Sequence, residues 1–497
     1  MKSVLLRPHG PNDGWLRQHQ GRRIRLRLAD GYELCGVLTE FSRTELHLCA
    51  DDGSPAVVVS RHAIALAQAA GGVAPAALAR VAVAGAGDAD PLPRLIATLT
   101  RTARRYPATA AFVATFIVYW LSYQGRNQVY NQFVLLADAF AHGRLHVIVN
   151  APWLELAKWE GRQYVAYPPM PGVLLTPFVA LFGPTFPQPL FSVVLGAINA
   201  ALCYLALWHL FKNRTVAAWS TALFAFGTVQ WYAAENGSVW TVEHVVALFF
   251  LWLAILEAAT RRRLPLIGLA LGCAYLSRLP TVLSVPFFVI YLWQDFLPRR
   301  RPIGTFDFRH LPRTYTDFAA GIMLAIALNA AYNYARFGTT GQAGYTLIGN
   351  FEGLWTFRYG LLDRHYMPGH LREMLLRGPA FRSSWPFVIP DIYAMSIWVT
   401  TPAFVIAIFA NWRSRIALGS ALAVVLIAIP ILMHHASGFS QFGYRYTLDF
   451  TPFLILLCAS AMRAGVTWWM KALIVLSILV NLWGVLMLSF FEISVFG

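Results

Sequence analysis

The feature that most constrains this chain is a series of apolar segments, which follow one another from residue 107 almost to the C-terminus. A helix needs about 20 mainly apolar residues to cross a bilayer. The 497 residues are 57% hydrophobic and 13% charged, which is unusual for a soluble protein. We therefore predict a mainly α-helical, polytopic membrane bundle with about eleven spans. The expected spans lie at about 107–124, 189–211, 215–233, 239–260, 264–278, 280–297, 317–335, 392–411, 416–434, 450–464 and 471–494.

The basic residues indicate how these spans are oriented. The formal net charge is +16, and cytoplasmic loops of membrane proteins carry such an excess. The basic clusters fall on the inner side if the short segment 170–182 does not cross the membrane. We therefore expect a cytoplasmic N-terminus and outer loops at 125–188 and 336–391. The clusters lie at 101–105, 212–214, 261–263, 299–301, 413–415 and 463–471.

The N-terminal hundred residues contain no continuous apolar core of a signal peptide, so the first span is expected to be an uncleaved anchor. The five cysteines show no CxxC spacing, and three of them lie in apolar segments. The sequence therefore predicts neither a disulfide framework nor a zinc site.

Residues from about 14 to 68 predict short β-strands instead of membrane helices. Ile24-Arg25-Leu26-Arg27-Leu28 alternates apolar and polar residues, as a half-buried strand does, and Asp30-Gly31 favours a tight turn. Several short strands separated by turns are typical of a small β-barrel. We expect a cytoplasmic barrel over 1–68, a linker rich in Ala, Gly and Pro over 69–104, and the membrane domain over 105–497.

This N-terminal pattern resembles the Sm-like family of the RNA chaperone Hfq over about 55 residues. The resemblance implies RNA contacts at Arg61 and His62, which match a basic-His pair of that family, although Ser60 stands where the family has an aromatic residue. The alternative is a barrel that serves assembly or regulation. The matching residues are Ile24-x-Leu26-x-Leu28-x-Asp30-Gly31-x-x-Leu34-x-Gly36-x-Leu38-x-x-Phe41 and Val58-Val59-Ser60-Arg61-His62-Ala63-Ile64.

The first outer loop contains an amphipathic helical pattern. Asn127, Asn131, Asp138 and His142 share one helical face, and apolar residues occupy the other. The pattern predicts a helix on the membrane surface whose polar face lines a water-filled cavity. The alternative is an interfacial helix with solvated polar residues.

Further ionisable residues lie in or beside the apolar segments. Glu235 is at an outer boundary, and Glu243-His244 is inside the following span. Such groups are costly in a membrane and usually mark a site or a pathway. Each has a structural alternative: a buried core histidine for His244, a helix break for Arg278, and an ion pair for Arg445 and Asp449, which are four residues apart.

The membrane part resembles the glycosyltransferase C superfamily over residues from about 100 to 495, in particular bacterial relatives of protein O-mannosyltransferases and lipid A aminoarabinose transferases. One N-terminal span precedes a large outer loop with a surface helix, a proline-rich corner and many further spans. The stretches that carry the resemblance are Asn131-x-Phe133-x-Leu135-x-Ala137-x-Ala139, Tyr167-Pro168-Pro169-x-Pro171-Gly172, Trp231-Tyr232 to Trp240, Tyr332-Asn333-Tyr334-Ala335-Arg336-Phe337-Gly338 and Gly443-Tyr444-Arg445-Tyr446.

The resemblance implies an enzyme of the bacterial inner membrane that transfers a sugar from a polyprenyl-phosphate-linked donor to an acceptor hydroxyl on the outer face. Asn127 and Asn131 stand where many relatives carry an early aspartate, and an amide cannot accept a proton at neutral pH. The base is therefore expected further along. The implied residues are Asp138, Glu155 and Glu235 for catalysis, Arg278 and Arg445 for the donor phosphate, and Asn127, Asn131, Tyr167, His244, Tyr446 and Asp449 for shaping the substrate site.

The expected partners are membrane lipid, the lipid-linked sugar, and an acceptor glycan, lipid or protein, with RNA or self-assembly at the N-terminal barrel. No cofactor is predicted; the sequence has no dense acidic cluster but leaves a divalent metal open. One alternative function is a transporter or flippase of lipid-linked sugars, which would place polar residues throughout the bundle. A second is a non-catalytic membrane scaffold with an RNA-binding or assembly module.

Overall fold

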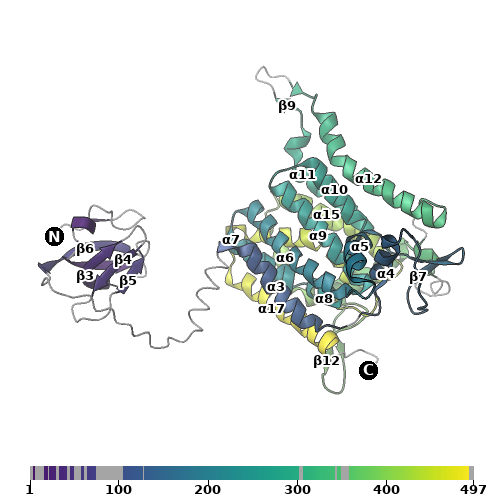
Figure 1. The fold of residues 1–497 in the computed structure, drawn as a ribbon, viewed down its shortest axis with the longest axis horizontal. Helices are drawn as coiled ribbons and strands as arrows, with labels where there is room; N and C mark the ends of the chain where they lie inside the picture. The colour runs from purple at the N-terminus through teal and green to yellow at the C-terminus, as the bar shows by residue number, and fades with distance from the viewer. Residues whose placement is uncertain are drawn as a thin grey trace. The chain divides into compact units, whose positions relative to one another are not determined.

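The chain divides into two compact units, Met1–Pro91 and Leu92–Gly497. The first contains a β-sheet, and the second is a helical bundle with three small strand pairs (Figure 1). The computed structural model describes residues 4–5, 16–18, 20, 22–28, 33–41, 45–49, 57–60, 64–73, 105–126, 128–300, 306–341, 344–348 and 357–491.

The N-terminal unit is an antiparallel sheet of six strands in the order β1-β6-β2-β3-β4-β5. Ile24 and Leu26 are both buried, because side chains two apart in a strand point to the same face. Closure of the sheet into the expected barrel stays a prediction, and Arg61 and His62 lie outside the described residues. The strands are β1 (Val4–Leu5), β2 (Arg22–Leu28), β3 (Glu33–Phe41), β4 (Glu45–Cys49), β5 (Val57–Ser60) and β6 (Ile64–Val73).

The second unit contains the apolar helices and one large buried core. The α-helices are α3 (Pro107–Tyr123), α4 (Gln132–Ala141), α5 (Met170–Phe182), α6 (Gln188–Phe211), α7 (Arg214–Phe226), α8 (Gln230–Asn236), α9 (Val239–Ala259), α10 (Leu264–Tyr275), α11 (Val285–Tyr291), α12 (Leu311–Phe337), α13 (Met367–Leu376), α14 (Ile397–Thr400), α15 (Arg415–Leu432), α16 (Thr451–Ala461) and α17 (Trp468–Val485). Short 3-10 or π turns are η2 (Leu279–Ser284), η3 (Trp293–Phe296), η4 (Gly344–Leu347), η6 (Arg364–Tyr366), η7 (Pro402–Phe409), η8 (Arg445–Asp449), η9 (Met462–Ala464) and η10 (Leu486–Phe490). The strand pairs are β7 (Leu156–Trp159) with β8 (Arg162–Val165), β9 (Arg299–Arg300) with β10 (Phe306–Asp307), and β11 (Ala380–Phe381) with β12 (Val388–Ile389).

Five of the described helices are long and apolar enough to cross a membrane: α6, α9, α12, α15 and the helix from α17 into η10. The structure therefore supports a membrane bundle, whereas several expected spans are shorter or broken. The expected span 280–297 consists of η2, α11 and η3, and the expected span 392–411 consists of α14 and η7. Proline explains both breaks, because Pro280, Pro286 and Pro402 lack the N–H that a continuous helix requires.

The loop between α3 and α6 begins and ends at the same end of the bundle, which we call the loop end. The Gln188 side chain at the start of α6 accepts a hydrogen bond from Phe133 N (3.1 Å) and donates to Gly237 O (2.8 Å), just before α9. Within this loop α5 has 13 residues, and thus a length of about 20 Å, less than the hydrocarbon core of a bilayer. The expected surface helix is shorter than predicted, because α4 begins only at Gln132, after a turn with positive φ at Gln124 and Gly125.

We call the opposite end of the bundle the basic end. The directions of the helices show which residues lie there. Both α6 and α9 start at the loop end, and Lys212 and Arg261 follow their last turns. In contrast, α15 begins beside Arg413 and Arg415 and ends next to the loop end, where Asp363 N donates to Met433 O (2.8 Å).

Glycines bring α10 and α12 into direct backbone contact. Gly268 and Gly272 are four residues apart, so they lie on one face of α10. A Cβ at Gly268 would lie 2.0 Å from Phe318 O, and one at Gly272 would lie 2.5 Å from Gly321 O. Small residues allow such close approach of membrane helices. The contact fixes α12 at the edge of the bundle (Figure 1).

Candidate functional site

A buried arginine and two carboxylates form the polar centre of the bundle at the loop end. Arg278 donates from Nη1 to Glu243 Oε1 (2.6 Å), and from Nε (3.1 Å) and Nη2 (3.0 Å) to Asp449 Oδ2. The His244 Nδ1 lies 2.7 Å from Asp449 Oδ1. The side chains of His244 and Asp449 are fully buried, and that of Arg278 is 12% exposed. We call these four residues the arginine cluster.

Breaks in the helices bring the members of this cluster together. Glu243 and His244 lie near the start of α9. Arg278 follows the end of α10 in an extended conformation (φ −145°, ψ 108°), because the chain turns into η2 instead of continuing the helix. Asp449 is the last residue of η8. The cluster therefore joins three segments that are far apart in sequence.

Arg445 supplies a second cation beside this cluster. Its guanidinium lies 5.0 Å from the centre of the Tyr446 ring, and the guanidinium of Arg278 lies 5.3 Å from the same ring. Arg445 donates to the neutral Gln441 amide (2.9 Å) and forms no ion pair among the described residues. Three buried atoms here have no hydrogen-bond partner in the described part of the chain: Glu243 Oε2, His244 Nε2 and Arg445 Nε.

Glu155 belongs to a separate aromatic–carboxylate group in the first loop. Its Oε2 accepts hydrogen bonds from the Tyr167 hydroxyl and from Trp240 Nε1 (3.0 Å). Burial and the Glu155 carboxylate raise the pKa of Tyr167 well above its usual value, so the phenol keeps its proton and remains a donor. Within the described residues, Oε1 of Glu155 has no partner.

A row of rings connects Glu155 with the arginine cluster. The Tyr167 ring is 5.6 Å from the Tyr345 ring, and Tyr345 is 6.5 Å from His434. His434 is in turn 5.8 Å from Tyr446, whose ring lies near both arginines. Because Tyr345 is in η4, the loop that follows α12 contributes to this site along with the loop between α3 and α6. We call the whole assembly the loop-end site.

Two further histidines border this row. His370 Nδ1 lies 2.6 Å from the Tyr444 hydroxyl. Burial lowers the pKa of His370 to about 4, with a further contribution from His435, and burial lowers the pKa of His435 to about 4. Both imidazoles are therefore neutral at pH 7. Among the described residues, no group of three or more His, Cys, Asp or Glu side chains is arranged to hold a metal ion.

The three carboxylates expected to be catalytic have separate partners. Asp138 is bound by Arg144 (3.1 Å) near the end of α4. Glu235 is fully buried, where Arg126 Nη2 (2.6 Å) and the Ser489 hydroxyl donate to it. Of the three, only Glu155 belongs to the row that reaches the arginine cluster.

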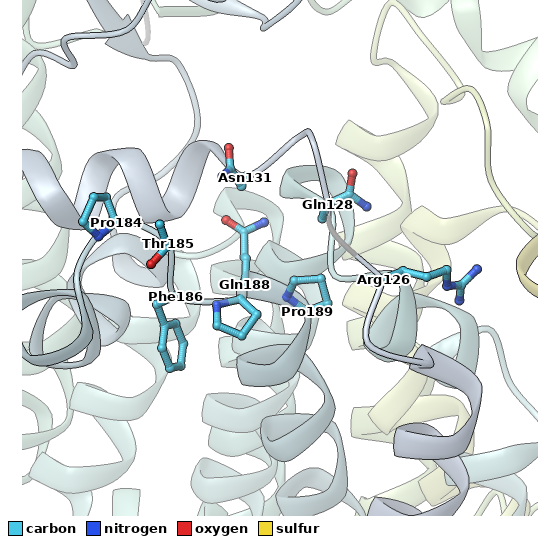
Figure 2. Close-up of a pocket in the computed structure, with 9 residues that line it drawn as sticks. Arg126, Gln128, Asn131, Pro184, Thr185, Phe186, Gln188 and Pro189 are labelled. Atoms are coloured by element: carbon cyan, nitrogen blue, oxygen red, sulfur yellow. The ribbon is translucent and has the colours of Figure 1, made fainter.

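The expected asparagines lie elsewhere. Asn127 is outside the described residues, and Asn131 lines a cavity of about 350 Å³ between the start of α4 and the start of α6. In Figure 2, Gln188 lies at the centre of this cavity and the Arg126 guanidinium points away from it, towards its own partners. No carboxylate lines this cavity, whereas the loop-end site contains the buried and unpartnered Glu243 Oε2. The loop-end site is therefore the candidate functional site.

The sequence predicts most charged members of the loop-end site but not three of its aromatic members. These are Trp240, Tyr345 and His434. Aromatic residues are frequent throughout this chain, so their types and spacing gave no signal. Tyr167, His244, Arg278, Arg445, Tyr446 and Asp449 do lie in this site.

No protein-family model matches the chain, and no curated protein matches it. Among solved structures, the chain is similar to the crystal structure of ArnT from Cupriavidus metallidurans bound to undecaprenyl phosphate. The sequence identity is 14% and the TM-score is 0.42; the match covers 71% of this chain and 60% of that chain. The matched part thus spans less than two thirds of ArnT. Because this similarity is low, the function must be argued from the residues of the site.

Proposed function

We propose that this chain is a membrane glycosyltransferase, which transfers a sugar from a polyprenyl-phosphate-linked donor to an acceptor hydroxyl at the loop end. One observation carries the proposal. Glu155, a carboxylate with an unpartnered oxygen, and Arg445, a guanidinium without an ion-pair partner among the described residues, are joined by one row of rings at the same end of apolar helices.

Glu155 is the general base of this proposal. The hydrogen bonds from Tyr167 and Trp240 fix its Oε2 and leave Oε1 for the acceptor. Oε1 takes the proton of the acceptor hydroxyl as that oxygen bonds to the anomeric carbon of the sugar. The bond from this carbon to the donor phosphate breaks, and polyprenyl phosphate leaves with the bonding electrons.

Arg445 binds the phosphate of the donor. Arg278 is less suited to this role, because its donors already serve Glu243 and Asp449. Drawing Arg278 away would leave the buried carboxylates of Glu243 and Asp449 without their arginine partner, which is strongly unfavourable. Arg278 therefore holds the site together, and Arg445 supplies the free charge-assisted hydrogen bonds that a phosphate requires.

The base assignment is tested by Glu155→Gln in purified protein supplied with undecaprenyl-phosphate-linked sugars. Loss of a general base lowers a rate by about 10²–10⁴-fold, and we expect a loss in transfer of this size. Asp138→Asn is the matched control, because it makes the same carboxylate-to-amide change in the same loop at an Arg144 pair outside the site. Equal transfer rates in the two variants would contradict the role of Glu155.

The phosphate assignment is tested by binding of undecaprenyl phosphate itself. Arg445→Gln should weaken binding about 10- to 100-fold, because a hydrogen bond to a charged group contributes roughly 1.5–3 kcal/mol. Arg144→Gln is the control, since Arg144 pairs with Asp138 away from the rings. Wild-type binding by Arg445→Gln would contradict the role of Arg445. Movement of lipid-linked sugar across vesicles without any transfer would favour the flippase alternative.

A further inference from the structure

A second cavity lies at the basic end of the bundle, far from the loop-end site. It has a volume of about 280 Å³ and lies between the last turn of α6, the start of α15 and the end of α16. Helix α6 has 24 residues, so its two ends are separated by about 36 Å, which exceeds the hydrocarbon core of a bilayer. This cavity and the loop-end site therefore face opposite sides of the same membrane bundle.

One basic residue lines the cavity, and three others are sequence neighbours of residues that line it. Arg463 is in its wall, Lys212 follows the lining residue Phe211, and Arg413 and Arg415 flank the lining residue Ser414 in the sequence. All four basic side chains are exposed, and none of them forms an ion pair among the described residues. No acidic side chain is among the residues that line the cavity. The charge therefore favours an anionic ligand.

The basic residues at the cavity differ from Arg262 and Arg263 at the same end, which have acidic partners. Arg263 is bound by Glu257 (2.8 Å), and Arg262 lies 3.5 Å from Asp295. General positive charge on a cytoplasmic face requires no cavity. The free cations here coincide with a hollow, which indicates a bound group and not only a topological signal.

The lining of the cavity includes both apolar and polar residues. Leu210 and Ile416 supply apolar surface, and Asn411 and Ser460 supply polar groups. Next to Asn411, Trp412 is 46% exposed, and aromatic residues of this kind collect at the membrane–water interface. An anion bound beside apolar lining residues, at the end of a membrane helix, is best supplied by a lipid.

We propose that the cavity lined by Arg463, Asn411 and Ser460 binds the phosphate headgroup of an anionic glycerophospholipid from the leaflet at the basic end. Arg463 pairs with the phosphate, Asn411 and Ser460 face the polar headgroup, and the acyl chains leave along Leu210 and Ile416. The site is separate from the loop-end site and does not depend on the proposed transferase reaction.

The proposal is tested by titrating the purified full-length protein with phosphatidylglycerol or phosphatidylcholine in neutral detergent and counting bound lipids by native mass spectrometry. We expect preferential binding of phosphatidylglycerol, and about tenfold weaker binding by Arg463→Gln, since a charge-assisted hydrogen bond is lost. Arg463→Lys should retain part of the affinity. Phosphatidylcholine binding should be the same in all variants.

Arg261→Gln is the matched control, because Arg261 is exposed at the same end and does not line the cavity. Equal losses in Arg261→Gln and Arg463→Gln would assign the binding to general surface charge and overturn the proposal. Wild-type affinity in Arg463→Gln would also overturn it. Displacement of phosphatidylglycerol by excess inorganic phosphate would assign the cavity to a free anion instead of a lipid.

Discussion

Glu235 is a buried carboxylate outside the loop-end site, and its surroundings decide when it carries a charge. Arg126 and Ser489 donate hydrogen bonds to its fully buried side chain. Burial raises the pKa of Glu235 to about 7, and the Ser489 hydrogen bond and the Arg126 charge offset only part of this effect. An unfolded glutamate has a pKa of about 4.3. The folded state therefore binds this proton more tightly than the unfolded state does.

The stability that this group contributes should fall as the pH rises. A raised carboxyl pKa stabilises the fold fully below the unfolded pKa, and this contribution is lost between about pH 4.5 and pH 7. The expected loss over that window is about 3 kcal/mol. The unfolding temperature in detergent should therefore drop between about pH 5 and pH 8, and Glu235→Gln should flatten this drop.

Asp317→Asn provides the control for this pH dependence, because Asp317 is 42% exposed and pairs only at 3.8 Å with Arg313. The Asp317→Asn variant should show the same drop in unfolding temperature with rising pH as the wild-type protein. An unchanged slope in Glu235→Gln would show that another buried group carries the effect.

At the level of elements, the contact between α10 and α12 depends on the absence of side chains. Gly272→Val would place a Cβ 2.5 Å from Gly321 O and 2.8 Å from the Ala325 Cβ. Because backbone atoms block it, the helices must separate, and overpacking of this kind costs about 1–3 kcal/mol. We expect a lower unfolding temperature for Gly272→Val. Gly369→Ala in α13 is the control, since a Cβ there meets nothing within 4 Å, and equal stability of both variants would contradict the contact.

The elements also show what sequence patterns could predict and what they could not. Apolar composition indicated the membrane helices, and the alternation at Ile24 and Leu26 indicated a strand with one buried face. The spacing of apolar residues did not predict where the helices begin and end. Gln124 and Gly125 adopt positive φ and delay α4, and Pro402 turns an expected span into 3-10 structure, because local backbone constraints override an apolar pattern.

For the whole molecule, ionisable groups in apolar segments indicate where the candidate site lies, but they do not indicate which partner each group has. Arg278 and Asp449 are predicted site residues because a charged side chain in an apolar segment is energetically costly. They are 171 residues apart, and no local pattern indicates that one binds the other. Arg445 and Asp449 were a plausible helical ion pair from their spacing, yet Asp449 pairs with Arg278 and His244 instead. The ion-pair partners of Asp449 are therefore set by tertiary packing and not by its spacing from Arg445 in the sequence.

The arginine cluster joins α9, the α10–η2 junction and η8, so its loss should weaken the bundle as a whole. Asp449→Asn leaves Arg278 with only Glu243, and breaking a buried ion pair costs about 3–5 kcal/mol. Asp317→Asn at the exposed pair with Arg313 should cost less than about 1 kcal/mol. Unfolding in detergent, followed for both variants, measures the difference.

The double variant Asp449→Asn with Arg278→Gln should lose less stability than the sum of the losses in the two single variants, because each change removes the partner that the other leaves unpaired. Strict additivity of the two losses would show that Arg278 and Asp449 act independently.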